Sequence, residues 1–160
     1  MKNQIEIKTA RNPAGFLAAK ELILEYIEWL SFDLAFQHID KELDSLPEMY
    51  GDPEGGLVLA CINGKAVGVA GIRKYAEGEC ELKRMFVKPE GRGLGIGNLL
   101  IAACIEIAKK LNYDIIKLDT ADFMKSAIKL YLDNGFIEIP AYRHNPHEAA
   151  RYFELKISRL

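Results

Sequence analysis

The sequence predicts a mixed α/β domain (an α+β arrangement) in which helices cover both faces of one mixed sheet. Two observations predict this class. Residues 57–87 contain three apolar strands separated by tight turns, as antiparallel hairpins do. The third strand runs through a glycine-rich loop into a long apolar helix, which is typical of a β-α-β crossover. The length of 160 residues suits a single domain over 1–160.

The first expected elements are a strand and two helices. Residues 4–9 alternate polar and apolar side chains, as a half-buried strand does. Pro13 suits the first turn of a helix, and residues 14–29 carry apolar side chains at helical spacing. A second helix is expected over residues 36–46, and Pro47 ends it.

Three antiparallel strands are expected next. An apolar run at 57–62 is followed by Asn-Gly at 63–64, a strong hairpin signal. The chain returns over 67–74, turns again at 77–78 and continues as a third strand over 79–87. These strands should form the antiparallel part of the sheet.

The second half of the chain alternates helices and strands. The expected elements are a helix after the glycine-rich loop (99–111), a strand (115–118), a helix (125–133) and two closing strands (136–139 and 151–157). The predicted order is therefore β-α-α-β-β-β-α-β-α-β-β.

The composition is typical of a globular protein of the cytoplasm. Apolar residues make up 49% and charged residues 28%, and a net charge of -2 gives no bulk attraction to nucleic acid or to an anionic membrane. The cysteines (Cys61, Cys80 and Cys104) are odd in number and lack CxxC spacing, so we expect buried thiols rather than disulfides or a zinc site. Neither a signal peptide nor a membrane-spanning run is evident. We expect a cytoplasmic protein with no nucleic-acid or membrane partner.

The most informative segment is residues 91–97, where glycine recurs at every second position and Arg92 lies among the glycines. Glycine lets backbone N–H groups turn toward a ligand without obstruction from a side chain. The first turn of the following helix adds N–H groups without helical partners, and its dipole favours negative charge. The loop is therefore predicted to bind phosphate.

Three other interpretations of this loop fit less well. A nucleotide-hydrolase P-loop needs Lys followed by Ser or Thr after the glycines, and no such pair follows. A dinucleotide site needs GxGxxG after the first strand, but Gly95 and Gly97 lie too close together and the chain opens with antiparallel strands. A hairpin without a ligand has little use for these glycines, since each costs roughly 0.5–1 kcal/mol relative to alanine in regular structure.

Two motifs resemble those of the GCN5-related N-acetyltransferase (GNAT) superfamily. Residues 92–97 (RGLGIG) match its R/Q-x-x-G-x-G/A signature, and residues 127–136 (AIKLYLDNGF) match the form A-x-x-L-Y-x-x-x-G-F. The segment 81–89 resembles the family's fourth strand. The resemblance implies the acyl-CoA N-acyltransferase fold, a central mixed and largely antiparallel sheet of about seven strands flanked by four helices.

The resemblance also implies acetyl-CoA as the co-substrate, with no metal. The loop would bind the pyrophosphate through Arg92, Gly93, Leu94, Gly95, Ile96, Gly97 and Asn98. The family splays its fourth and fifth strands, so the backbone of Met85, Phe86 and Val87 would pair with the pantetheine arm. The amide of Met85 would stabilise the oxyanion formed at the thioester carbonyl. One departure is Met124, where many members carry an asparagine that contacts this arm.

Acetyl transfer to an amine needs a base for the amine and an acid for the departing thiolate. Tyr131 matches the family tyrosine that protonates the sulfur; the plainer interpretation is a core aromatic residue. Glu81 is the candidate base, because strand alternation predicts that it shares a face with Met85 and apolar surroundings would raise its pKa. The alternatives are an ion pair of Glu81 with Lys83 or Arg84, or a water molecule that carries the proton.

The acceptor is expected to be the primary amine of a small molecule or peptide, which receives the acetyl group directly in a ternary complex. In the family, the first two helices and the last strands shape the acceptor site. Here they contain Trp29, Phe32, Phe36, His38 and the segment 142–147. Arg73, Arg84 or Arg143 beside an aromatic pocket would bind a carboxylate on the acceptor.

The alternative function is a non-catalytic acyl-CoA-binding regulatory domain of the same fold, and the presence of Glu81 and Tyr131 favours the enzyme. Exposed late strands of this family often pair between subunits, so a homodimer is one expected assembly. His144 and His147 flank a proline and are expected to face solvent rather than bind a metal.

Overall fold

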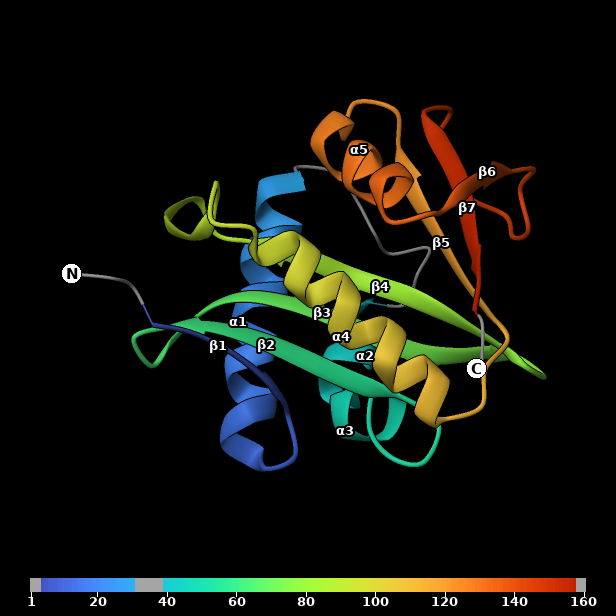
Figure 1. Cartoon of the computed structure of the whole chain (residues 1–160). Coiled ribbons are helices and arrows are strands. Elements are labelled where there is room, and N and C mark those ends of the chain that lie inside the picture. The colour runs from blue at the N-terminus through green and yellow to red at the C-terminus, as the bar shows by residue number, and fades with distance from the viewer. Residues whose placement is uncertain (1–3, 31–38, 158–160) are drawn as a thin grey trace.

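The computed structural model of the protein describes residues 4–30 and 39–157 (Figure 1). Its elements are, in chain order, β1 (Ile5–Thr9), α1 (Pro13–Leu30), α2 (Ile39–Asp44), α3 (Leu46–Met49), β2 (Gly56–Ile62), β3 (Lys65–Ala76), β4 (Glu79–Val87), the 3₁₀-helix η2 (Pro89–Gly91), α4 (Ile96–Lys110), β5 (Ile115–Ala121), α5 (Lys125–Asp133), β6 (Ile137–Ile139) and β7 (Ala150–Lys156). The predicted order of elements is confirmed, apart from the second helix.

The second predicted helix is divided. Its first residues, 36–38, lie outside the described part of the chain, and the remainder forms α2 and α3 with a break at Ser45. Pro47 stands in the first turn of α3, where a missing N–H leaves no helical hydrogen bond unmade. The described residues therefore contain five α-helices where four were predicted.

The strands of the described residues form one seven-stranded sheet in the order β1-β2-β3-β4-β5-β7-β6. Neighbouring strands are antiparallel except β4 and β5, which are parallel. Helix α4 connects these two strands across one face of the sheet (Figure 1). The predicted mixed, largely antiparallel sheet is confirmed, and its single crossover places the glycine-rich loop at the carboxyl end of β4.

Helices cover both faces of the sheet, as predicted. Helix α4 lies in front of the sheet in Figure 1 and α1 lies behind it. Leu100 and Ile101 of α4 are buried in one core together with Ile128 of α5. Leu22 and Ile23 of α1 are buried in the other core. The cysteines are buried and free, in agreement with the expectation of buried thiols.

The two parallel strands separate toward their carboxyl ends. Pairing joins residues 79–81 of β4 to residues 115–117 of β5, although β4 continues to Val87 and β5 to Ala121. Figure 1 shows the strands diverging from this short paired region. The splayed strands implied by the family resemblance are therefore present. Beyond residue 81, this edge of β4 has no strand partner among the described residues.

Candidate active site

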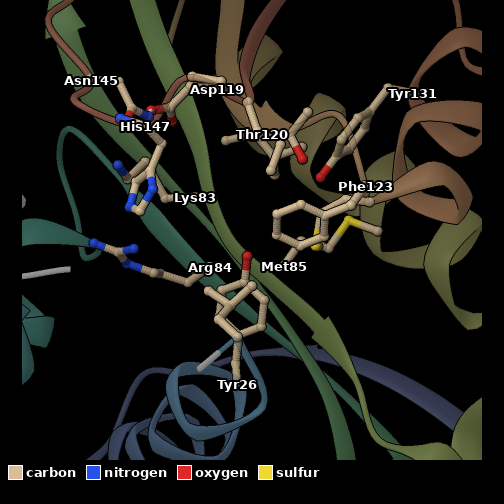
Figure 2. A pocket seen from close by; sticks show the side chains of 16 residues that line it. Tyr26, Lys83, Arg84, Met85, Asp119, Thr120, Phe123, Tyr131, Asn145 and His147 are labelled. Atoms are coloured by element: carbon tan, nitrogen blue, oxygen red, sulfur yellow. Dashed lines mark hydrogen bonds between the residues drawn. The ribbon is translucent and has the colours of Figure 1, made fainter. Parts of the chain in front are cut away.

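A pocket opens where β4 and β5 separate (Figure 2). The residues that line it include Tyr26, Lys83, Arg84, Met85, Asp119, Thr120, Phe123, Tyr131, Asn145 and His147. They come from α1, from the two splayed strands, from α5 with the loop before it, and from the segment before β7. Figure 2 shows the charged and amide side chains on one side of the pocket and Met85, Phe123 and Tyr131 on the other.

The glycine-rich loop runs from the carboxyl end of β4 to the first turn of α4. Gly93 and Gly95 have φ angles of 79° and 78°, in the left-handed region that favours glycine. Within the described residues, the amides of residues 93–98 donate no hydrogen bond to a protein acceptor. Unpartnered amides at a helix N-terminus are suited to an anionic ligand.

The two sequence motifs lie against each other through α4 and α5. A Cβ on Gly97 would lie 2.7 Å from Cδ2 of Leu130, so the absence of a side chain permits this close packing. Asn134 donates a hydrogen bond from Nδ2 to Oδ1 of Asn98, at 2.9 Å. These contacts hold the helix of the loop beside the helix that carries Tyr131.

Arg92 folds back toward the strand that precedes the loop. Its Nε donates to the carbonyl oxygen of Val87 at 3.1 Å, and its guanidinium carbon lies 5.8 Å from the centroid of the Trp29 ring. Trp29 also lies beside Tyr26 and Phe86, with ring centroids 6.4 and 6.5 Å away. Trp29 therefore joins α1 to the loop, and it is not one of the pocket-lining residues.

Strand β4 contains a bulge at Arg84, whose φ is 59°. Lys83 pairs with Gly71 of β3, whereas Phe86 pairs with Val69. Two residues of β4 therefore oppose one residue of β3, which is the pattern of a β-bulge.

The bulge reverses the alternation of side chains along β4. Met85 packs against the core that contains Cys80 and Leu82, whereas Glu81 turns to the other face and contacts Arg73. The prediction that Glu81 and Met85 share a face is wrong, because one extra residue shifts a two-residue period by one.

Glu81 is buried among hydrogen-bond donors, with an exposed fraction of 1%. Its Oε2 accepts from the hydroxyl of Tyr142 at 2.7 Å and from Nη1 of Arg143 at 2.9 Å, and its Oε1 accepts from Arg73 at 3.3 Å. Burial by itself would raise the pKa of Glu81, but nearby Lys83 and these donors outweigh it and lower the pKa. The expectation of a raised pKa is therefore wrong. The role of Glu81 as the base stays a prediction without two of its supports.

Arg84 and Glu42 form a buried pair that holds the bulge to α2. Arg84 donates from Nε to Oε2 of Glu42 at 2.6 Å and from Nη2 to Oε1 at 3.1 Å. Tyr50 and Arg73 also donate to this carboxylate, at 2.9 and 3.4 Å. Burial would raise the pKa of Glu42, but Arg84 and the other donors outweigh it and lower the pKa. The pair fixes a residue of unfavourable backbone conformation beside Met85.

Tyr131 serves the core and the pocket at once. Its ring lies 5.8 Å from that of Phe136 and 6.4 Å from that of Phe153. Its hydroxyl points into the pocket (Figure 2). Burial, together with Tyr26 and Asp119, raises the pKa of Tyr131 well above its usual value. The phenol is therefore protonated at neutral pH and available as a proton donor.

The charged wall of the pocket is the part that sequence reasoning missed. Lys83 is buried, and Asn145 donates from Nδ2 to Oδ2 of Asp119 at 3.0 Å. Burial is the largest influence on Lys83 and lowers its pKa to about 8. His147 lines the pocket, so the expectation that it faces solvent is wrong. The available signal was a lysine inside the apolar strand 79–87.

The predicted acceptor residues are only partly at the pocket. Phe32, Phe36 and His38 lie outside the described residues. Tyr142 and Arg143 bind Glu81 instead of lining the pocket, and the Arg84 guanidinium is engaged by Glu42, as described above. None of the predicted arginines therefore presents a guanidinium that is open to a carboxylate.

Two further findings concern metals and membranes. Within residues 4–30 and 39–157, no group of three or more His, Cys, Asp or Glu side chains is placed to hold a metal ion. No helix in this part of the chain combines the length and apolar character that crossing a membrane requires.

The chain is similar to acetyltransferases in sequence. The profile of the Acetyltransferase (GNAT) family matches residues 23–136. An uncharacterized N-acetyltransferase of Schizosaccharomyces pombe is 35% identical over 98% of this chain and 98% of that protein. An uncharacterized N-acetyltransferase of Dictyostelium discoideum is 31% identical over 80% of this chain and 88% of that protein. N-acetylaspartate synthetase of Rattus norvegicus is 30% identical over 82% of this chain and 44% of that protein.

The chain is also similar to solved acetyltransferases in structure. A GNAT-family acetyltransferase of Staphylococcus aureus Mu50 superposes with a TM-score of 0.80 at 27% identity, over 97% of this chain and 100% of that chain. The fold is shared with an acetyltransferase of Bacillus anthracis solved in complex with acetyl coenzyme A. That chain gives a TM-score of 0.61 at 24% identity, over 68% of this chain and 66% of its own length.

Proposed function

The chain belongs to the Acetyltransferase (GNAT) family and is an N-acetyltransferase, and from this premise we propose that it transfers acetyl directly from acetyl-CoA to a primary amine of a small molecule or peptide. One observation carries the proposal. The unpartnered amides of the glycine-rich loop and the hydroxyl of Tyr131 lie at the two sides of a strand edge that has no neighbour. Donor and acceptor would meet there in a ternary complex.

The donor would bind along the loop and the open edge of β4. The amides of residues 93–98 would hold the pyrophosphate, and Arg92 would add a positive charge beside it. The pantetheine arm would pair with the backbone of residues 85–87, as a peptide adds to a sheet edge. Because Arg92 already occupies the carbonyl of Val87, the arm would compete for that group or use its neighbours.

The chemistry would be an addition followed by an elimination. The amine nitrogen attacks the thioester carbonyl carbon, and the Met85 amide stabilises the negative oxygen that forms. The carbon–sulfur bond then breaks, the amine loses a proton, and the phenol of Tyr131 protonates the departing thiolate. The products are an N-acetyl amine and the free thiol of coenzyme A.

The proton of the amine would leave through water rather than directly to Glu81. The carboxylate of Glu81 is engaged by Tyr142, Arg143 and Arg73 and has a lowered pKa, so it is a weak base with little room for a substrate. Water was one of the carriers considered from the sequence, and the geometry supports that alternative.

A relative bears the name N-acetylaspartate synthetase, so an amine that also carries carboxylates belongs among the acceptors to test. The alternative function remains a regulatory domain that binds acyl-CoA without catalysis. The protonated Tyr131 at the pocket favours the enzyme. A cytoplasmic location, a single domain and a homodimer stay predictions.

Titration of the protein with acetyl-CoA, followed by an assay of thiol release across a panel of amines, tests the proposal. We expect saturable binding of acetyl-CoA, thiol release that depends on the amine, and an N-acetylated product by mass spectrometry. Tight binding without thiol release for any amine would favour the regulatory domain. Absence of binding would reject the proposed coenzyme site.

A further inference from the structure

The pocket has a charged wall and an apolar wall, and an acceptor must match both. Figure 2 shows Lys83, Asp119 and His147 on one side. Met85 and Phe123 lie on the other. A simple alkyl amine would satisfy the apolar wall and leave the charged wall facing a group that cannot pair with it.

The arginines near the charged wall are already paired within the protein. Arg84 binds Glu42 at 2.6 Å, and Arg143 binds Glu81 at 2.9 Å. Arg73 bridges both carboxylates, at 3.4 Å from Glu42 and 3.3 Å from Glu81. A ligand carboxylate would have to break a buried ion pair to reach any of them, which is costly because it leaves a buried charge uncompensated.

The charges of this region do not balance. Among the described residues it contains four cations and three carboxylates, namely Arg73, Lys83, Arg84 and Arg143 with Glu42, Glu81 and Asp119. Lys83 is the lysine that lines the pocket. Burial lowers its pKa although Asp119 and Glu81 both act to raise it, so an added anion would stabilise its charged form.

We propose that Lys83 binds a carboxylate of the acceptor, and that the acceptor is therefore an amine that also carries a carboxylate. This inference rests on the proposed function, because it concerns the acceptor of the same site.

The position of Lys83 on β4 also limits the size of this acceptor. Lys83 and Met85 both line the pocket and are two residues apart on one strand, roughly 6–7 Å at the usual rise per residue and less across the bulge. The thioester carbonyl is proposed to lie at the amide of Met85. A carboxylate at Lys83 therefore leaves room for only a few atoms before the amine, as in an amino acid.

The same position could instead serve as a base, because a lysine of lowered pKa is neutral more often than usual. The two roles differ in what they recognise. A base acts on any amine, whereas an anion-binding lysine acts only on an amine that carries an anion. Paired acceptors with and without the carboxylate therefore separate the two roles.

Rates of thiol release from acetyl-CoA with three acceptor pairs test the inference: alanine and ethylamine, phenylalanine and phenethylamine, and aspartate and β-alanine. In the wild-type protein, kcat/KM should favour the carboxylate-bearing member of at least one of the first two pairs by roughly 10- to 100-fold, the range for one hydrogen bond to a charged group. Lys83→Gln should abolish that preference by slowing the amino acid and leaving the plain amine within about 2-fold.

Lys117→Gln is the matched control. Lys117 is a mostly buried lysine of the neighbouring strand, paired with Glu79 at 2.9 Å and absent from the pocket lining, so its loss should leave the preference unchanged. Acetyl-CoA affinity, measured for each variant, reports an intact coenzyme site. An equal loss with both members of a pair would overturn the inference in favour of a base.

Turnover of plain amines with no preference for amino acids would also overturn it and would leave the proposed function standing. Loss of acetyl-CoA binding by the wild-type protein would reject the proposed function itself, so the two failures are distinguishable.

Discussion

The two ends of the pocket are built from different parts of the chain. The end that we propose binds the coenzyme consists of backbone groups from one continuous segment, residues 85–98. The end that we propose binds the acceptor consists of side chains from α1, two strands and the segment before β7, with Lys83, Asp119 and His147 among them. A backbone site is specified by glycine and by strand geometry, whereas a side-chain site depends on the whole fold. The first can therefore be shared widely among related chains while the second varies.

The largest effect is expected where the two ends meet, at Tyr131. Tyr131→Phe should lower kcat by roughly 10²- to 10⁴-fold, because the leaving thiolate loses its acid. The dissociation constant of acetyl-CoA, measured by calorimetry, should stay within about 2-fold, since one hydroxyl that donates to the sulfur adds little to ground-state binding.

Tyr113→Phe is the control for this prediction. Tyr113 is also a buried tyrosine, but its hydroxyl donates to the carbonyl of Glu54 at 2.6 Å, away from the pocket. It should cost some stability and leave kcat unchanged. Equal kcat values for wild type and Tyr131→Phe would remove Tyr131 from the mechanism.

The next effect should separate the coenzyme end from the rest. Gly95→Val should weaken acetyl-CoA binding by roughly 100-fold, equivalent to the loss of about two hydrogen bonds to a charged group. Gly64→Val places the same side chain at a similar φ, 86° against 78°, and neither added Cβ meets an atom within 4 Å. Both variants should lose similar stability, so a comparable fall in coenzyme affinity for both would show that the loop amides are not the binding groups.

The smallest effect on activity is expected behind the acceptor end, at Glu81. Glu81→Gln should lower kcat less than about 10-fold at pH 8, far less than the loss of a general base would. A loss of 100-fold or more would restore Glu81 as the base.

The pH dependence of stability gives a second measure of Glu81. Its pKa is lowered in the folded protein, from an ordinary value of 4.5, so the stability that it adds is present above that value and is lost as the pH falls through the folded pKa. Chemical denaturation at a series of acid pH values should show a flatter decline for Glu81→Gln than for the wild type. Glu138→Gln, at an exposed pair with Arg151, should follow the wild type.

The sequence predicts the coenzyme end of this site well and the acceptor end poorly, for a physical reason. The strand, the glycines and the helix are neighbours in the chain, so spacing alone predicts the cradle. The face of Glu81 could not be read in this way, because the bulge at Arg84 depends on a pairing register with β3 and on a carboxylate 42 residues away. The contact of Asn145 with Asp119 likewise spans 26 residues and has no local signal.

The open edge of β4 has a consequence for the life of the protein as well as for its chemistry. A donor that pairs with residues 85–87 would complete the sheet and slow hydrogen exchange at those amides, so the substrate would become part of the folded structure. At a concentration 100 times its dissociation constant, such a ligand adds roughly 2.7 kcal/mol to the free energy of unfolding. The abundance of this enzyme would then rise and fall with the supply of acetyl-CoA, and a starved cell would lose part of its folded pool.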